Sequence, residues 1–335
     1  FIPAFAALLA GTRERSWPPW VMLGLFFTIC IGFRNQVGGD WGSYLRYYDQ
    51  EIGRALTDPM KGDPGYIFLN RLMVHLNWKV YGVNLVCGLI FTGGLVTFCR
   101  GLYRSWLAFA IAVPYLVVVV AMGYSRQGVA LGLIFWALAY LEQGKFVPYV
   151  LFIAVAALFH QTAIIMIPLG IFLYRHGWVY RIIAVALIAA GLWDALVAED
   201  IEHLWAAYVD HKMHSQGAVI RVTMNCTAAV ILIVYWKQWK KVYPNALLWL
   251  WMALGAIACV FVVRYATTAV DRLALYLTPL QVVVFSRLPF LARNKYDPDT
   301  MVVWILAGYG AVLFVWLHFA THGQYWLPYR NILFE

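Results

Sequence analysis

Charged side chains are scarce in this chain of 335 residues, where Asp, Glu, Lys and Arg together make up only 12%. Hydrophobic residues make up 63%, and the mean hydropathy is +0.71. A water-soluble domain cannot hide so much apolar surface, which excludes a soluble enzyme or binding module. The apolar runs are continuous rather than alternating, which argues against strands. The sequence therefore predicts an all-α, polytopic membrane protein.

Several signatures of chemistry are also missing. There is no Walker loop, no dinucleotide fingerprint, no Gly-x-Ser-x-Gly motif and no recognisable spacing of metal ligands. The five cysteines lie inside apolar runs, which indicates small core residues rather than a disulfide framework. We therefore expect no metal, no cofactor and no nucleic acid, whereas a lipid bilayer is a required partner.

The apolar runs divide the chain into about eleven or twelve spans. They lie near residues 17–33, 80–99, 105–123, 127–141, 146–159, 160–174, 182–197, 221–236, 244–263, 273–286 and 301–320, with a further run at 1–10. Several are shorter than the roughly 20 residues that a straight crossing needs. The stretch 146–174 predicts a hairpin of short helices that meet near His160. No internal repeat or soluble domain is visible, so residues 1–335 are expected to form a single integral membrane domain.

The loops between these spans alternate between two kinds. One kind is short and basic, which is typical of the cytoplasmic side; its clusters are Arg13 with Arg15, Arg100 with Arg104, Lys145, Arg175 with Arg181, Lys237 with Lys240 and Lys241, and Arg287 with Arg293 and Lys295. The other kind includes two longer segments, 34–79 and 198–220, which we place on the outer face. Residues 65–78 predict an interfacial helix with one apolar stripe and one charged face that includes Arg71. The C-terminal residues 326–335 either pack over this surface or fray.

Single arginines lie at the outer ends of the spans: Arg34, Arg126, Arg221, Arg264 and Arg272. Arginine is costly near a bilayer and is usually retained there for a reason. Guanidinium groups bind phosphate oxygens bidentately, and Gln127 follows Arg126 at a helix start, where backbone N–H groups favour anions. This set predicts a site for an anionic group such as a pyrophosphate. The alternative is that each arginine snorkels to lipid headgroups or pairs with a neighbouring acid such as Asp271.

The segment 33–48 is unusually polar and glycine-rich for a stretch that directly follows a span. Its Asp40 is a candidate general base or ligand for sugar hydroxyls. The rings of Trp41, Tyr44 and Tyr47 are suited to stacking on sugar faces, although an interfacial aromatic belt is the alternative. Such a belt does not require Gly38-Gly39-Asp40, which favours a site.

His160 is the second candidate base. It is followed by Gln161 and Thr162 at the expected top of the hairpin, where it is able to accept a proton or donate to a phosphate. The alternative for a lone histidine in an apolar run is a hydrogen-bonded position in the core. We prefer Asp40 as the base, with His160 as the alternative.

In order and spacing, these motifs resemble the EpsG family of bacterial exopolysaccharide polymerases, which are Wzy-like membrane proteins. The resemblance covers most of the chain and rests on Arg34, Gly39-Asp40-Trp41, Tyr44, Asp63-Pro64-Gly65-Tyr66, Ser125-Arg126-Gln127, Phe159-His160, Arg221, Arg272 and Pro328-Tyr329-Arg330. The family pattern commonly has tyrosine where this chain has Trp41, and an aromatic ring is kept.

The resemblance implies a glycosyltransferase of the GT-C type in the bacterial inner membrane. Such an enzyme takes polyprenyl-pyrophosphate-linked oligosaccharides as donor and acceptor on the periplasmic face, alongside other proteins of the export pathway. Its pyrophosphate ligands would be Arg126 and Arg272, helped by Arg34, Gln127 and Arg221, and its sugar contacts would be Trp41, Tyr44, Tyr47, Asp271 and Tyr329. Direct displacement would invert the anomeric carbon, and arginines would carry the charge without a metal.

Two other functions stay open from the sequence. A transporter of lipid-linked oligosaccharides or small solutes shares broken helices, but it would show an inverted repeat or polar residues at the midplane. An acyltransferase that modifies polysaccharide with His160 as base would need a second catalytic acid and an acyl donor from the cytoplasm. The arginine-rich outer face favours the polymerase over both.

Overall fold

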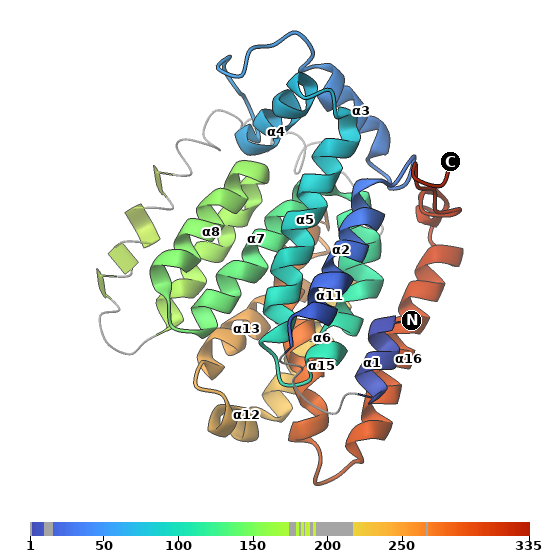
Figure 1. The fold of residues 1–335 in the computed structure, drawn as a ribbon. Helices are drawn as coiled ribbons and strands as arrows, with labels where there is room; N and C mark the ends of the chain where they lie inside the picture. The colour runs from blue at the N-terminus through green and yellow to red at the C-terminus, as the bar shows by residue number, and fades with distance from the viewer. Residues whose placement is uncertain are drawn as a thin grey trace.

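The computed structural model describes residues 2–9, 16–173, 217–265 and 267–335, with short helical stretches between 179 and 191. Within these ranges the chain is helical and has no strand, which confirms the expected all-α class. Most of the long helices run side by side (Figure 1). They are α1 (Ile2–Leu9), α2 (Pro18–Gly32), α5 (Lys79–Arg100), α6 (Ser105–Ala112) with its π-helical continuation η1 (Val113–Ala121), α7 (Ser125–Glu142), α8 (Phe146–Phe159), the 3₁₀ helix η2 (Gln161–Leu173), α11 (Ala218–Val234), α13 (Ala246–Val262), α14 (Thr267–Leu277), α15 (Pro279–Leu291) and α16 (Pro298–Phe319).

Two helices in the described ranges, α5 and α16, are long and apolar enough to cross a membrane, and the count rises to four if each bent pair is one span. The bent pairs are α11 with α12 (Trp236–Val242), at 78°, and α14 with α15, at 44°. The other apolar helices are shorter, as the short apolar runs predict. These helices confirm a helical membrane protein, while eleven or twelve full crossings stays a prediction. Most of the expected span 182–197 and of the loop 198–220 falls outside the described residues.

Small residues allow α5 and α7 to pack closely. A Cβ added at Gly94 would overlap the carbonyl oxygen of Gly132, and one at Gly132 would lie 2.5 Å from the Cα of Phe91. Close backbone approach at small residues is typical of helix pairs in membranes, where packing replaces the hydrophobic effect between helices. On its other side α5 meets α2, where the hydroxyls of Thr28 and Thr92 are 2.6 Å apart. Helix α5 therefore packs between α2 and α7.

The predicted hairpin at residues 146–174 is confirmed. Helix α8 ends at His160, whose φ of −157° and ψ of 106° are extended, and η2 turns back along α8 from Gln161. The hydroxyl of Tyr149 donates to the carbonyl of Met166, which joins the two arms in an apolar setting. The break places His160 and Gln161 at the same end of the bundle as the segment 33–79.

That end carries two short helices, α3 (Trp41–Asp49) and α4 (Pro64–His75), at the top of Figure 1, while α12 lies at the opposite end. The opposite end holds the ion pair of Arg287 with Glu142, 3.1 Å apart, and that of Arg104 with Asp299, also 3.1 Å. The basic loops and the lone arginines therefore gather at opposite ends of the described bundle, as their alternation predicts.

The interfacial helix expected at 65–78 is the helix α4, and His75 on its charged face is exposed, as is Lys79 beyond its end. Arg71 on the same face is fully buried, with its Nε 2.5 Å from Glu51 and its Nη1 2.6 Å from the carbonyl of Asp58. Arg71 differs because the loop 50–63 folds over α4 and supplies acceptors to its guanidinium. This arginine holds the outer loop against α4.

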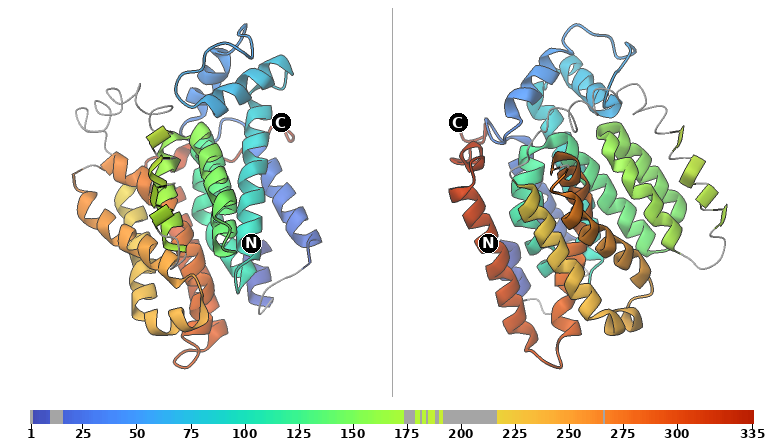
Figure 2. Two further views of the ribbon diagram at one scale, coloured as in Figure 1. Left: turned by 90° about the vertical axis from the view of Figure 1, so that its left-hand side faces the viewer. Right: turned by 180° about the vertical axis from the view of Figure 1, so that it is seen from behind.

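The C-terminal segment packs back over the outer end rather than fraying. Asn35 N–H donates to the carbonyl of Arg330 at 3.0 Å, and Ile332 N–H donates to that of Phe33 at 2.9 Å. Trp326 is buried and its indole donates to the carbonyl of Val118 at 2.7 Å. The two views of Figure 2 show the C-terminus beside the outer helices.

The α5–α7 contact generates a stability prediction. Gly94→Ala should lower the thermal unfolding midpoint in detergent, because overpacking a close helix contact costs about 1–3 kcal/mol. Gly308→Ala on α16 is the matched control, since a Cβ there meets nothing within 4 Å. Equal midpoints for the two variants would contradict the close packing.

Candidate functional site

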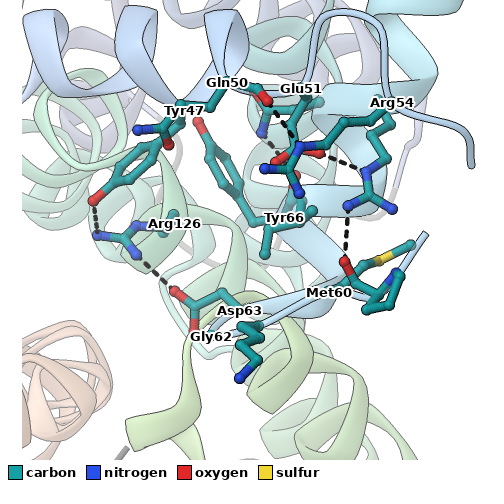
Figure 3. A pocket seen from close by; sticks show the side chains of 14 residues that line it. Tyr47, Gln50, Glu51, Arg54, Met60, Gly62, Asp63, Tyr66 and Arg126 are labelled. Carbon is teal, nitrogen blue, oxygen red and sulfur yellow. Dashed lines mark hydrogen bonds and ion pairs between the residues drawn. The ribbon is translucent and has the colours of Figure 1, made fainter. Parts of the chain in front are cut away.

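An ion pair between Arg126 and Asp63 forms the centre of the outer end. The Arg126 Nη1 is 2.8 Å from one carboxylate oxygen of Asp63, and the other carboxylate oxygen accepts the backbone N–H of Gln161 at 3.3 Å. The side chain of Gln161 donates to the carbonyl of Gly62 at 3.1 Å. The starts of α4, α7 and η2 are thus joined through one carboxylate. Figure 3 shows its pairing with Arg126.

Local sequence explains why this carboxylate is available. Asp63 is the residue before α4, and Pro64 occupies the first helical turn, where its missing N–H costs nothing. The Asp63 side chain makes no hydrogen bond to its own helix, so it reaches across to Arg126. Arg126 lies in the first turn of α7, where free backbone N–H groups add positive potential.

Three tyrosines surround the Arg126 side of the pair. The Arg126 guanidinium lies 4.9 Å from the ring centroid of Tyr47, and its Nη2 is 3.4 Å from the Tyr47 hydroxyl. The Tyr44 ring is 5.8 Å from that of Tyr66, and the Tyr47 ring is 6.4 Å from it. Aromatic rings around a cation present flat faces beside charge, which suits a sugar attached to a phosphate.

Asp40 lies close to this arrangement. It immediately precedes α3, and its carboxylate forms no capping hydrogen bond. Burial raises the pKa of Asp40 above its ordinary value, while Arg126, Arg272 and His322 act in the opposite direction. Its carboxylate is therefore within the electrostatic reach of both arginines.

Asp63 shares these surroundings. Burial raises its pKa, and Arg126, the Gln161 N–H and Arg272 oppose that rise. Arg272 comes from α14, far from Arg126 in sequence, yet it acts on both carboxylates. Arg272 and Asp40 thus interact electrostatically with the Arg126–Asp63 ion pair, and we call these four residues the outer cluster.

The loop that carries Asp40 is held by close contacts. Gly38 has a φ of +104°, which a residue with a side chain rarely adopts, and its N–H donates to the carbonyl of Tyr325 at 2.8 Å. A Cβ at Gly39 would touch the ring of Trp326, and one at Gly123 would overlap that ring. The C-terminal segment therefore sets the position of Asp40.

His160 is the other predicted base. It is 7% exposed, and its Nε2 is buried without a hydrogen-bond partner among the described residues. Two residues later, the hydroxyl of Thr162 lies 3.3 Å from that of Tyr276 on α14. His160 therefore lies beside the cluster with one ring nitrogen available.

Arg34 occupies a different position from the other arginines. It is fully buried and donates to the carbonyl of Ile31 at 2.5 Å, to the Asn84 side chain at 3.2 Å and to the Ser125 hydroxyl at 2.7 Å. These bonds brace α2 against α5 and the start of α7. The guanidinium of Arg34 is fully buried, so it exposes no surface to a ligand here. Its bond to Ser125 holds the residue that precedes Arg126.

The remaining predicted residues lie around the cluster. Arg221 pairs with Asp271 at 2.6 Å. The Tyr329 hydroxyl donates to the carbonyl of Cys30 at 2.8 Å, at the end of α2. Trp41 faces the Arg34 guanidinium, 5.9 Å from ring centroid to carbon, and Gln127 is half-buried beside Arg126. A sugar or phosphate contact for each of these residues stays a prediction.

A pocket of about 450 Å³ opens beside the ion pair. It is bounded by Arg126, Asp63, Tyr47 and Tyr66 on one side and by the polar loop 50–62 on the other (Figure 3). Arg54 and Lys61 add positive charge to its wall. The pocket has room for a sugar unit with polar substituents.

Sequence reasoning missed Asp63 as a site residue. A Gly-Asp-Pro sequence indicates a turn, but a turn does not reveal what its carboxylate contacts. The available signal was the resemblance, since Asp63-Pro64-Gly65-Tyr66 is one of the motifs that support it. Among the described residues, no three His, Cys, Asp or Glu side chains gather to hold a metal ion.

Comparison with known proteins gives one positive result. The model of the EpsG family matches residues 19–331, which is nearly the whole chain. No curated protein and no solved structure gives a significant match. The chain therefore belongs to the EpsG family, and this membership indicates in general terms a membrane protein that polymerises exopolysaccharide.

Proposed function

We propose that this protein is a glycosyltransferase that polymerises polyprenyl-pyrophosphate-linked oligosaccharides at the outer face of the bacterial inner membrane. The observation that carries the proposal is the Arg126–Asp63 ion pair, 2.8 Å long, beside a pocket at the outer end of the helices. Arg272 and Asp40 lie within its electrostatic surroundings. A pyrophosphate leaving group needs cations, and an acceptor hydroxyl needs a base. Both kinds of group lie in this cluster beside an aromatic-lined pocket.

The proposed reaction is a direct displacement. The acceptor hydroxyl attacks the anomeric carbon of the donor sugar, and the bond from that carbon to the pyrophosphate oxygen breaks. The hydroxyl proton passes to a carboxylate, and the polyprenyl pyrophosphate leaves with the bonding electrons. Such a step inverts the anomeric carbon. Arg126 and Arg272 stabilise the charge that develops on the leaving oxygen.

The two carboxylates have different parts in this scheme. Asp63 already accepts bonds from Arg126 and from the Gln161 N–H, so it acts as a positioning residue that holds the Arg126 guanidinium. Asp40 forms no capping bond, and burial raises its pKa, which strengthens it as a base. We therefore assign proton removal to Asp40 and keep His160 as the alternative.

The pocket beside Arg126 is suited to a sugar of a lipid-linked substrate. Its tyrosine rings offer stacking faces, while Arg54, Lys61 and Asn70 offer donors for hydroxyl and carboxylate groups. The outer placement follows from the basic clusters at the other end of the bundle, which favour the cytoplasmic side. Polyprenyl-linked sugars presented outside the cell membrane need no nucleotide, in keeping with the missing nucleotide motifs.

The leaving-group role predicts the effect of removing each arginine. Arg126→Ala and Arg272→Ala should each lower polymer formation about a hundredfold or more, because each removes charge stabilisation of the transition state. Arg→Lys should rescue poorly, since the planar guanidinium fork is lost. Polymer is measured on gels with membranes of equal protein content.

Arg264, exposed at the outer end of α13, is the matched control. Arg264→Ala should retain polymer formation because it lies outside the proposed contacts. Normal polymer from both Arg126→Ala and Arg272→Ala would refute the pyrophosphate site.

The base assignment predicts a separation of binding from turnover. Asp40→Asn should keep affinity for the lipid-linked substrate and lose roughly a hundredfold to ten-thousandfold in single-turnover rate, the usual worth of a general base. Asp63→Asn and His160→Ala should weaken binding as well. Asp49→Asn, exposed at the last residue of α3, the helix that Asp40 precedes, is the control for a lost surface charge.

The pH dependence of activity tests the assignment of Asp40 as the base a second time. Since burial raises the pKa of Asp40 above 3.8, protonation should remove activity at a pH higher than for an ordinary aspartate. This acid limb should survive in Asp63→Asn. An active Asp40→Asn enzyme beside a His160→Ala enzyme that binds but does not turn over would move the base to His160.

The charge carried by the two arginines also predicts the response to chelation. In vitro polymerisation should survive EDTA, because guanidinium groups supply the positive charge that a divalent cation supplies elsewhere. The described residues also offer no cluster of three metal ligands. Activity lost with EDTA and restored by added Mg²⁺ or Mn²⁺ would contradict this prediction.

A further inference from the structure

An apolar groove lies on the flank of the bundle between α11 and α16, with η1 as its floor. Its volume is about 400 Å³. Its walls are apolar along most of their length; the lining includes Pro114, Val119, Ile220, Met224, Ala311, Val312, Val315 and Phe319. Helix α16 is long and apolar enough to span a membrane, and only 17% of its most apolar window is buried. An exposed apolar flank on such a helix is expected to face lipid.

The lower part of the groove is closed by a chain of buried hydrogen bonds. Gln281 donates to the side chain of Asn225 at 2.6 Å, and the Tyr309 hydroxyl donates to Gln281 at 2.7 Å. Asn225 in turn donates to the carbonyl of Ala274 at 2.7 Å. These bonds join α11, α15 and α16, which fixes the width of the groove between them.

The rim of the groove carries a cation. Arg221 lines the groove, lies 4.9 Å from the ring centroid of Tyr115 and pairs with Asp271 at 2.6 Å. Asp271 is followed directly by Arg272, one of the two arginines of the proposed pyrophosphate site. Asp271, the ion-pair partner of Arg221, is therefore the direct neighbour in sequence of Arg272 in that site.

We propose that this groove holds the isoprenoid tail of a polyprenyl-pyrophosphate substrate, with Arg221 at the junction of tail and head. This inference rests on the proposed function, which supplies the class of lipid. Apolar walls match a hydrocarbon chain, and the cationic rim matches the anionic group to which that chain is attached. Continuity with Arg272 favours this lipid over a bulk phospholipid.

A second apolar groove on the other side of α16 provides an internal comparison. It lies between α1, α6 and α16, has a volume of about 430 Å³ and is lined by residues such as Ala4, Val113, Gly310 and Phe314. Its lining, as far as the chain is described, contains His318 but neither arginine nor lysine. The groove beside α11 therefore suits a lipid that brings a pyrophosphate to Arg272 better than the groove beside α1 does.

The test uses the full chain in nanodiscs and a polyprenyl pyrophosphate without sugars, with a photoreactive diazirine in its tail. We expect cross-links on α11 and α16 at groove residues such as Met224 and Val315. Ala311→Trp, which fills the groove from an exposed position, should lower this labelling about tenfold. It should raise the KM for lipid-linked substrate with little change in kcat.

Two matched variants of α16 locate the effect. Ala307→Trp lies one turn from Ala311, outside the groove lining, and should leave labelling unchanged. Gly310→Trp fills the groove on the α1 side and should also leave it unchanged. Labelling lost with Gly310→Trp but kept with Ala311→Trp would overturn the assignment. Val315→Trp repeats the test if the melting temperature of Ala311→Trp falls.

Two further outcomes separate this inference from the proposed function. Cross-links at the groove that a diazirine phosphatidylglycerol gives equally, and that polyprenyl pyrophosphate does not displace, would mean a bulk-lipid groove and refute the tail site. Intact polymerisation with no groove labelling would also refute it, while leaving the proposed function in place. Saturable groove labelling that persists in Arg126→Ala, where polymer is lost, supports the tail site independently of turnover.

Discussion

The pairing of Arg126 with Asp63 is the interaction on which the outer end depends. At 2.8 Å it joins the first turn of α7 to the residue before α4, and the second oxygen of Asp63 reaches η2 through the Gln161 N–H. Without the carboxylate, Arg126 would be a partly buried charge with no counter-charge in contact, which is strongly unfavourable. The pair thus sets both the packing of three segments and the position of the cation that we assign to the leaving group.

Positive and negative groups are equal in number around this ion pair. Arg126 and Arg272 both act on Asp40 and Asp63, so the two positive charges offset the two negative charges. A pyrophosphate adds negative charge and strengthens the demand for both arginines. In the proposed reaction, proton uptake by Asp40 removes one negative charge as the leaving group develops another. The cluster therefore suits a reaction in which negative charge moves from a carboxylate to a phosphate oxygen.

Sequence reasoning succeeded where the information was local. Continuous apolar runs located the helices, and the length of the stretch 146–174 predicted the break at His160. It did not foresee the burial of Arg34, because a lone arginine at a helix end looks the same in sequence whether it meets a ligand or a distant side chain. Its partners Asn84 and Ser125 are 50 and 91 residues away. Arg71 and Asp63 were misjudged for the same reason, since Glu51 and Arg126 reach them only through the folding of the outer loop.

The C-terminal segment fixes the position of the loop that carries Asp40. Asp40 lies on a loop whose Gly38 N–H is held by Tyr325 and whose Gly39 faces the ring of Trp326. Trp326 is in turn anchored on η1 through the carbonyl of Val118, and η1 is the floor of the groove beside α16. Because α16 leads directly into this C-terminal segment, the helix that borders the groove also positions the loop of the proposed base, Asp40. A lipid tail that moved α16 would therefore also move Asp40, and in our proposal this couples substrate binding to the position of the base.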